Sequence, residues 1–223
     1  MQPRTFVIGD IHGCAATLRG LIDGVLRAVP TDRIYLLGDL IDRGPDSKGV
    51  LEYIFELQGR GLSVKSVRGN HEEMFLQAGD DHHYLELWTA NGGLATLESF
   101  QADGPGDVPH HYRAFLASLP LYILLDDFVI VHAGLNFEPP SPFDDASAML
   151  WTRSSYVDRH RIGGRRLICG HTPVSRLDLE TSLSSSKIMI DNGCVFGGQP
   201  EGGSLAALEL ETMTVYYQEN CDL

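Results

Sequence analysis

Five short strand-like segments of this chain each run into a polar residue beside a glycine, and this pattern constrains the fold more than any other feature. In open α/β sheets, ligands bind beyond the carboxyl ends of the strands, so these polar side chains should converge on one site. Glycine at such a position lets the backbone turn tightly and approach a ligand. The five segments and the motifs that follow them are Thr5–Ile8 with Gly9-Asp10-Ile11-His12-Gly13, Arg33–Leu37 with Gly38-Asp39, Ser63–Val67 with Arg68-Gly69-Asn70-His71, Phe128–Val131 with His132-Ala133-Gly134, and Arg166–Cys169 with Gly170-His171.

The strand-like segments alternate with segments of helical length, which indicates an α/β architecture. The first predicted helix, Ala15–Ala28, places Leu18, Leu21, Ile22 and Val25 on one face. No repeat or convincing linker divides the chain, so we expect one domain over residues 1–223. The remaining predicted elements are helices Ser47–Gln58, Gly92–Phe100 and about His111–Leu119, strand Lys187–Ile190, and a closing hairpin of Ser204–Leu210 and Thr214–Tyr217.

Composition excludes several classes of protein. A formal net charge of −13 argues against a nucleic-acid binder, which needs a basic face to neutralise phosphates. No apolar stretch approaches the roughly 20 residues that span a membrane, and the N-terminal apolar run is too short for a signal peptide. The four cysteines form no CxxC pair, so we expect reduced thiols in a cytoplasmic protein. The oligomeric state stays open.

The polar residues at the strand ends suit a pair of metal ions. They offer carboxylate, amide and imidazole donors without a thiolate, which fits manganese, iron or zinc. Two ions close together lower the pKa of a bridging water and hold both oxygens of an in-line displacement, which is the chemistry of phosphoester hydrolysis. Asp39 is the natural bridge between one ion held by the first two motifs and a second held by the later three. The predicted ligands are Asp10, His12, Asp39, Asn70, His132 and His171.

Four further residues have predicted roles toward the substrate. His71 can protonate the leaving oxygen, and Asp42 can hold that imidazole in the required tautomer. Arg43 and Arg153 can clamp the phosphoryl oxygens, and Asn70 lies where it could contact the phosphate as well as a metal. A single Asp-x-His pair is more often part of a turn than of a metal site. The presence of all five motifs in order reduces the chance of such a purely structural explanation to roughly 5%.

The motifs GDIHG (9–13), GDLIDRG (38–44) and GNHE (69–72) resemble the PPP family of metal-dependent serine/threonine phosphatases, within the calcineurin-like phosphoesterases. The resemblance extends to His171 and is closest to the compact bacterial and phage-type members. It implies two mixed β-sheets packed as a sandwich and flanked by helices, with two metal ions, usually manganese, at one edge. It also implies the metal, acid and clamp roles given above. One departure is His132-Ala133-Gly134, where the family often has His-Gly-Gly.

The predicted function is hydrolysis of phosphate monoesters, foremost phosphoserine and phosphothreonine in proteins, by a metal-bridging hydroxide with His71 as general acid. A symmetrical diadenosine tetraphosphate hydrolase is the nearest alternative, because it shares the metal core. In that branch aspartate commonly replaces the glutamate of GNHE, so Glu72 favours the phosphoprotein substrate. A binding protein that has lost catalysis is a third possibility, but such proteins usually lack a ligand, the acid or the arginine.

Overall fold

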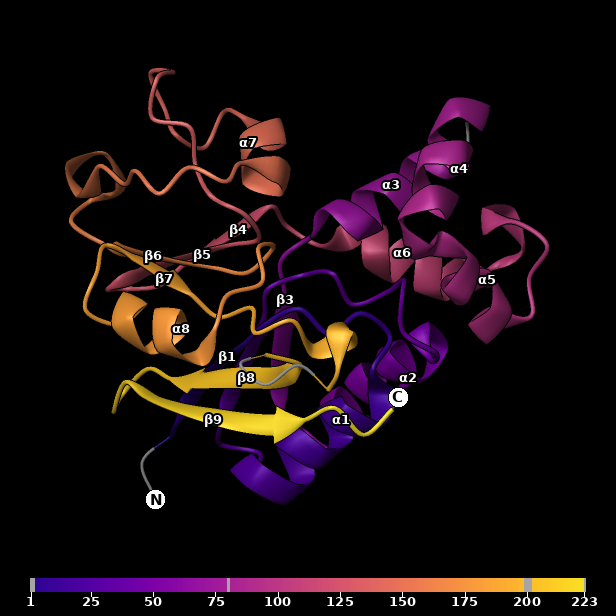
Figure 1. The fold of residues 1–223 in the computed structure, drawn as a ribbon, viewed down its shortest axis with the longest axis horizontal. Helices are drawn as coiled ribbons and strands as arrows, with labels where there is room; N and C mark the ends of the chain where they lie inside the picture. Colours follow the sequence, from indigo (N-terminus) through magenta and orange to yellow (C-terminus); the bar gives the residue numbers. More distant parts are fainter. Residues whose placement is uncertain (1–2, 80, 199–201, 223) are drawn as a thin grey trace.

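The computed structural model describes residues 3–79, 81–198 and 202–222, and its nine strands in these ranges form two mixed sheets (Figure 1). The first sheet has the order β3-β2-β1-β8-β9. Strands β1, β2 and β3 are parallel, while β8 runs antiparallel to β1 and pairs with β9 as a hairpin. Its strands are β1 (Thr5–Ile8), β2 (Arg33–Leu36), β3 (Ser63–Ser66), β8 (Ser204–Glu209) and β9 (Thr214–Glu219).

The second sheet has the order β4-β5-β6-β7. Strands β5, β6 and β7 are parallel, and β4 joins β5 in the antiparallel direction. Each sheet therefore contains a set of three parallel strands whose carboxyl ends share one edge. Its strands are β4 (Tyr122–Leu124), β5 (Phe128–Val131), β6 (Arg166–Cys169) and β7 (Lys187–Met189).

The two sheets pack face to face, through the side chains on one face of each sheet. Val7 and Tyr35 from the first sheet share an apolar cluster with Ile130 and Ile168 from the second. Residues one position along each strand point the opposite way, so Phe6 packs against the helices of the N-terminal half. Because side chains alternate across a strand, both faces of a central strand are covered. Strands β1 and β8 are buried along their whole length, while the edge strands β4 and β9 are partly exposed. The predicted α/β sandwich of two mixed sheets is confirmed.

Helices cover the outer faces and lengthen the connections between strands (Figure 1). The longest, α2, begins after Asp46, whose carboxylate accepts a hydrogen bond from the backbone N–H of Gly49 at 2.8 Å. None of the helices described here is long and apolar enough to cross a membrane. The α-helices are α1 (Ala15–Arg19), α2 (Ser47–Gly59), α3 (Asn70–Ala78), α4 (His82–Trp88), α5 (Leu94–Phe100), α6 (His110–Ser118), α7 (Ala146–Trp151) and α8 (Arg176–Ser182).

The first predicted helix differs from the expected one in its second half. From Gly20 to Leu26 the chain forms a π-helix, which has a wider turn than an α-helix. The wider turn rotates Val25 outward, to 38% exposure, and brings Leu26 inward, to 3%. The expected apolar face is therefore correct for Leu18, Leu21 and Ile22 and wrong for Val25.

Candidate metal centre

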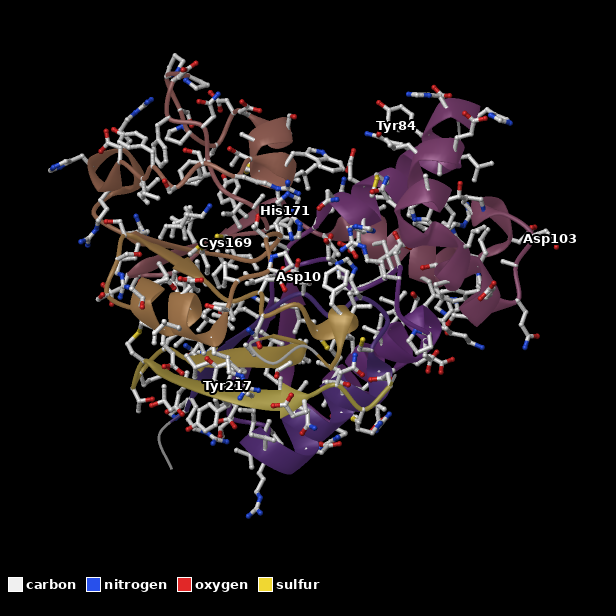
Figure 2. All side chains as sticks on the ribbon, in the orientation of Figure 1. Asp10, Tyr84, Asp103, Cys169, His171 and Tyr217 are labelled. Atoms are coloured by element: carbon white, nitrogen blue, oxygen red, sulfur yellow. The ribbon has the colours of Figure 1, made fainter. Side chains whose placement is uncertain are left out.

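The polar residues that follow the parallel strands lie together at the edge where the two sheets meet. Asp10 follows β1, Asp39 follows β2, His132 follows β5 and His171 follows β6. Figure 2 shows Asp10 and His171 near the middle of the molecule, although 160 residues of chain separate them in sequence. A direct contact joins them, because the backbone N–H of His171 donates to Oδ2 of Asp10 at 2.9 Å.

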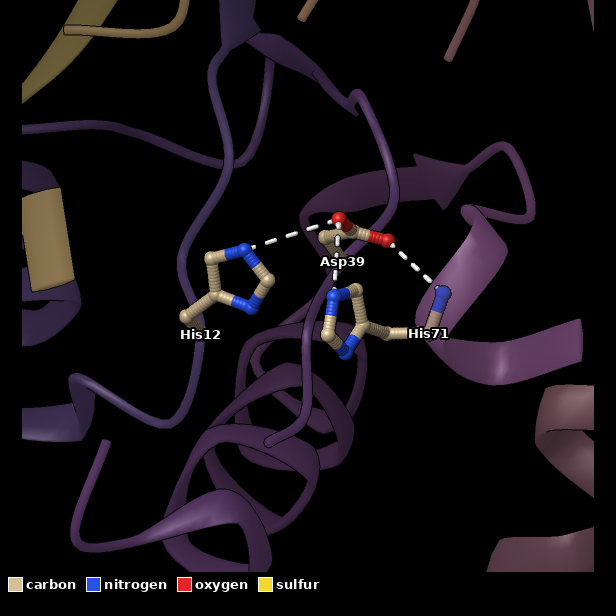
Figure 3. A group of neighbouring side chains, drawn as sticks. All are labelled: His12, Asp39 and His71. Carbon is tan, nitrogen blue, oxygen red and sulfur yellow. Dashed lines mark hydrogen bonds and ion pairs between the residues drawn. The ribbon is translucent and has the colours of Figure 1, made fainter. Parts of the chain in front are cut away.

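One group of possible metal ligands consists of His12, Asp39 and His71 (Figure 3). Oδ2 of Asp39 lies 3.5 Å from Nε2 of His12 and 3.9 Å from Nε2 of His71. Nδ1 of His12 lies 3.0 Å from the carbonyl oxygen of Ile41. That contact requires a proton on Nδ1, so the lone pair of Nε2 faces the carboxylate of Asp39.

A second group shares Asp39 and adds His132 and His171. Nε2 of His132 lies 2.8 Å from Oδ1 of Asn70 and 3.1 Å from Nδ1 of His171. Nδ1 of His132 lies 2.7 Å from the carbonyl oxygen of Leu37, so it carries the ring proton and Nε2 is a bare acceptor. Acceptor atoms that converge in this way repel one another unless a cation lies between them.

Asp10 lies beside these two groups and belongs to neither. Its side chain is 3% exposed, and Oδ1 is buried without a hydrogen-bond partner in the described part of the chain. Burial, and then the nearby carboxylates of Asp191 and Asp39, raise the pKa of Asp10 well above its usual value. Burial likewise raises the pKa of Asp191 to about 7. This surplus of buried negative charge fits a site for divalent cations.

The candidate histidine ligands favour the neutral form that binds metals. Burial lowers the pKa of His12 to about 3 and that of His171 to about 4. It also lowers the pKa of His132, despite the opposing effect of Asp39. Each imidazole therefore presents a lone pair at neutral pH, which is the state required of a ligand.

His71 has the opposite electrostatic character. Its Nδ1 donates to Oδ2 of Asp42 at 2.7 Å, and both side chains are almost fully buried. Burial acts to lower the pKa of His71, but the carboxylates of Asp39 and Asp42 outweigh it and raise the pKa above the usual value. Trp88 Nε1 and Thr96 Oγ1 also donate to Asp42, at 2.8 Å and 2.6 Å. Neither residue belongs to a motif at a strand end, so the sequence gives no signal for these two hydrogen bonds.

The two predicted phosphate clamps lie at opposite ends of the centre. Nη1 of Arg43 lies 2.8 Å from Nε2 of His12. The charge of Arg153 acts on His171, whose pKa it helps to lower. Arg43 thus points at a candidate ligand atom and would turn toward a phosphoryl oxygen once that atom binds a cation. Arg153 is exposed and follows α7.

Glu72 is a structural residue of the centre whose role the sequence did not reveal. It is fully buried, and its carboxylate accepts hydrogen bonds from the backbone N–H groups of Gly69, Asp39 and Leu40 at 2.7 to 2.9 Å. The first bond caps the start of α3, as the spacing of Gly69 and Glu72 would predict. The other two tie the loop that carries Asp39 to that helix. Only the folded chain shows this second pair of bonds.

The backbone is strained at the centre. Five of the eight non-glycine residues with positive φ in the described ranges are candidate site residues. L-amino acids with a Cβ disfavour this left-handed region, and each such residue costs about 1 kcal/mol or more. Strain concentrated at one place is typical of a functional site. The five residues are His12, Asp39, Asp42, Arg43 and His171, with φ between 47° and 71°.

A centre of neutral imidazoles and buried carboxylates at the carboxyl edge of two mixed sheets defines a metallophosphoesterase. Comparison with known proteins agrees: residues 3–175 match the Calcineurin-like phosphoesterase family, and the chain belongs to it. Members of this family depend on divalent metals, and the two groups of His and Asp residues could bind them.

Relatives in the family carry different names. The chain is 32% identical to "Serine/threonine-protein phosphatase 1" of Salmonella typhimurium, over 87% of this chain and 88% of that protein. It is 26% identical to "Bis(5'-nucleosyl)-tetraphosphatase PrpE [asymmetrical]" of Oceanobacillus iheyensis, over 86% and 85%. A crystal structure of a "putative diadenosine tetraphosphatase" shares the fold, with a TM-score of 0.68 and 22% identity, over 97% of this chain and 93% of that one. Phosphoester hydrolysis is therefore shared, while the substrate differs between relatives.

Proposed function

We propose that this protein is a manganese-dependent phosphatase that removes phosphate from phosphoserine and phosphothreonine in proteins. The convergence of Nε2 of His132, Nδ1 of His171 and Oδ1 of Asn70 within 3.1 Å of one another carries the proposal of a metal centre. The Salmonella relative and Glu72, which completes GNHE, support the phosphoprotein substrate.

The residues of the chain have separable tasks in this mechanism. Asp10, His12, Asp39, Asn70, His132 and His171 would hold two divalent cations, with Asp39 as the bridge. When bound, such a pair lowers the pKa of water and neutralises charge on the phosphoryl oxygens. Arg43 and Arg153 would bind the phosphoryl oxygens from opposite ends and orient them. His71, protonated on Nδ1 by its bond to Asp42, would give a proton from Nε2 to the leaving oxygen.

Release of phosphate from a phosphoserine peptide, measured with and without added manganese, tests this proposal. We expect turnover that requires the metal and that a chelator abolishes. Turnover that survives thorough chelation, or no turnover with several metals on any phosphoester, would show that the proposal is wrong.

Hydrolysis of a dinucleoside tetraphosphate is the second candidate, and the name of the Oceanobacillus relative favours it. The same metal centre could act on a phosphoanhydride, since in-line displacement at phosphorus is common to both reactions. A side-by-side assay on the phosphopeptide and on diadenosine tetraphosphate separates the two substrates. Chromatography of the nucleotide products would further distinguish symmetrical from asymmetrical cleavage.

A further inference from the structure

A groove opens directly beside the metal centre, along α7 and the segments on either side of it. Its volume is about 630 Å³, and its walls include Phe137, Glu138, Asp145, Trp151, Ser154 and Tyr156. We call this feature the α7 groove. Trp151 joins it to the centre, because its ring meets the ring of His171 edge to face, with 6.2 Å between centroids. A substrate whose phosphate lies at the centre would extend into this groove.

The groove exposes aromatic rings. Trp151 is 42% exposed and Tyr156 is 63% exposed, although most large apolar side chains of the protein are buried. Phe137 packs edge to face against Tyr156, with 5.7 Å between centroids. Exposed aromatic surface beside a reactive centre is typical of a binding site, because a ring of the ligand can stack on it or meet its edge.

The walls of the groove are held in place before any ligand arrives. The carboxylate of Asp145 accepts hydrogen bonds from Asn136 Nδ2 and from the N–H of Ala148, both at 2.9 Å. Arg161 donates to the carbonyl of Phe137, and Lys187 donates to the carbonyl of Ser154 at 2.8 Å. A ligand therefore pays little ordering entropy when it enters.

The charge of the groove indicates what kind of ring it accepts. Glu138 and Asp145 contribute carboxylates, and no lysine or arginine is among the described lining residues. A nucleotide leaving group would bring further phosphates past these carboxylates, where like charges repel. Arg161 and Lys187, which contact the walls through backbone carbonyls, offset part of that repulsion. An aromatic side chain of a peptide brings a ring without negative charge.

We propose that the α7 groove binds an aromatic side chain that flanks the phosphorylated residue of a peptide substrate. The inference rests on the proposed phosphoprotein substrate and adds a preference for the sequence around the phosphate. Trp151 and Tyr156 determine this preference by contact with the ring.

A set of phosphoserine peptides tests the preference in the metal-loaded enzyme. Phenylalanine is placed in turn at each flanking position, and the matched peptides carry alanine or the saturated ring cyclohexylalanine there. We expect kcat/KM to rise about threefold to tenfold for phenylalanine at one or two positions, mainly through KM. The cyclohexyl peptide should gain less, because it lacks the edge and face polarity of an aromatic ring.

Two variants assign the preference to the groove. In Trp151→Ala and in Tyr156→Ala, the ratio of kcat/KM between the phenylalanine and alanine peptides should fall toward one. Leu177→Ala is the matched control, since Leu177 is 74% exposed on α8 and does not line the groove, so both the activity and the ratio should persist.

Tryptophan fluorescence gives a readout that does not depend on turnover. The chain has two tryptophans, and Trp88 is buried. Because Trp88 donates to Asp42 at the centre, an alanine peptide with a phosphonate in place of the phosphate is the reference. The matching phenylalanine peptide should change the emission further, and Trp151→Phe should remove that difference.

The outcomes separate this inference from the proposed function. If phosphopeptides are hydrolysed at equal rates whatever the flanking residue, or if both groove variants keep the preference, the inference is wrong and the phosphatase proposal stands. If no phosphopeptide is hydrolysed while diadenosine tetraphosphate is, both proposals fall. A rise in KM for that dinucleotide in Trp151→Ala would then assign the groove to a nucleobase.

Discussion

His71 and Asp42 form the most completely buried polar pair of the centre, with side-chain exposures of 1% and 0%. Asp42 accepts from three donors at once, namely His71, Trp88 and Thr96. Burial raises the pKa of Asp42, but the three donors favour its ionised form and keep the imidazole of His71 in one orientation. The raised pKa of His71 follows from this arrangement and suits a residue that must arrive at the reaction with its proton.

The first prediction concerns this proton. In His71→Asn, kcat should fall by roughly 10²–10⁴ while the metal content stays unchanged. In the native enzyme, kcat should fall as the pH rises through the pKa of His71, which lies above the usual 6.5, and this limb of the profile should vanish in the variant. Steady-state kinetics with metal analysis checks both. Loss of the metals with full activity per remaining metal would contradict the assigned role.

The second prediction concerns Asp39, whose Oδ2 lies 3.5 Å from both His12 Nε2 and His132 Nε2. Asp39→Asn should empty or disorder the metal site, because an amide is a weaker bridging ligand than a carboxylate. Metal content by elemental analysis should fall, and activity should fall with it. Asp46→Asn is a suitable control, since Asp46 caps α2. A fully metal-loaded Asp39→Asn protein would contradict the bridge.

At the scale of elements, Glu72 joins two parts of the chain that meet only in the folded molecule. Its residue number places it in the first turn of α3, yet two of its three hydrogen bonds go to the loop after β2. Residues of α3 and of the loop after β2 are thereby fixed relative to each other, and with them Asn70 and Asp39. The geometry of the centre depends on this join.

The third prediction tests the join. Glu72→Ala leaves three buried N–H groups without their acceptor, so the free energy of unfolding should fall by about 3 kcal/mol or more. Glu73→Ala is the matched control, because Glu73 is partly exposed and pairs with Arg68 at 2.8 Å; its loss should cost less than about 1 kcal/mol. Urea unfolding of both variants gives the comparison. Equal losses of unfolding free energy in the two variants would show that the buried hydrogen bonds of Glu72 add no stability.

The sequence predicts the strands better than the helices, for a physical reason. A buried strand shows its character in three or four adjacent apolar residues, and β1, β5 and β6 have the predicted bounds. Helices α3, α4, α7 and α8 were not predicted, because they are short and their apolar residues are too few to show a period. Strand β4 is only three residues long and was not predicted either.

The sequence predicts the candidate metal ligands but not the residues that support them. Asp39, His132, His171 and Asn70 lie together as expected, since each lies one to four residues beyond the carboxyl end of a parallel strand. The supports could not be predicted, because Trp88, Thr96 and Glu72 reach the centre through packing that crosses between elements. The burial of Asp191 beside Asp10 likewise appears only in the fold.

At the scale of the whole molecule, the edge shared by the two sheets carries more buried negative charge than its own histidines neutralise. In the metal-free protein, burial raises the pKa of Asp191 to about 7, and burial with Asp191 and Asp39 raises the pKa of Asp10. These two carboxyl groups bind more protons folded than unfolded between about pH 4 and 7, so their contribution to metal-free stability should fall as the pH rises through that range. The lowered pKa values of His12, His132 and His171 act in the opposite sense.

The fourth prediction follows from this charge. Two divalent cations favour the ionised carboxylates, so metal binding should release protons near pH 7 and strengthen as the pH rises. At manganese concentrations about 100-fold above Kd, Tm should rise by about 5–10 °C. Calorimetry in buffers of different ionisation enthalpy counts the protons, and thermal unfolding with and without chelator measures the shift. An unchanged Tm would show that the metals do not stabilise the folded protein.

The left-handed backbone at five site residues sets a limit on how stable this protein can become. Glycine at any of those positions would relieve the conformational penalty, so selection for heat resistance alone would replace the very side chains to which we assign the chemistry. Each of them thus marks a compromise in which thermal robustness has been traded for reactivity. Substitutions meant to raise the Tm should therefore leave these five positions unchanged and be placed away from the metal centre.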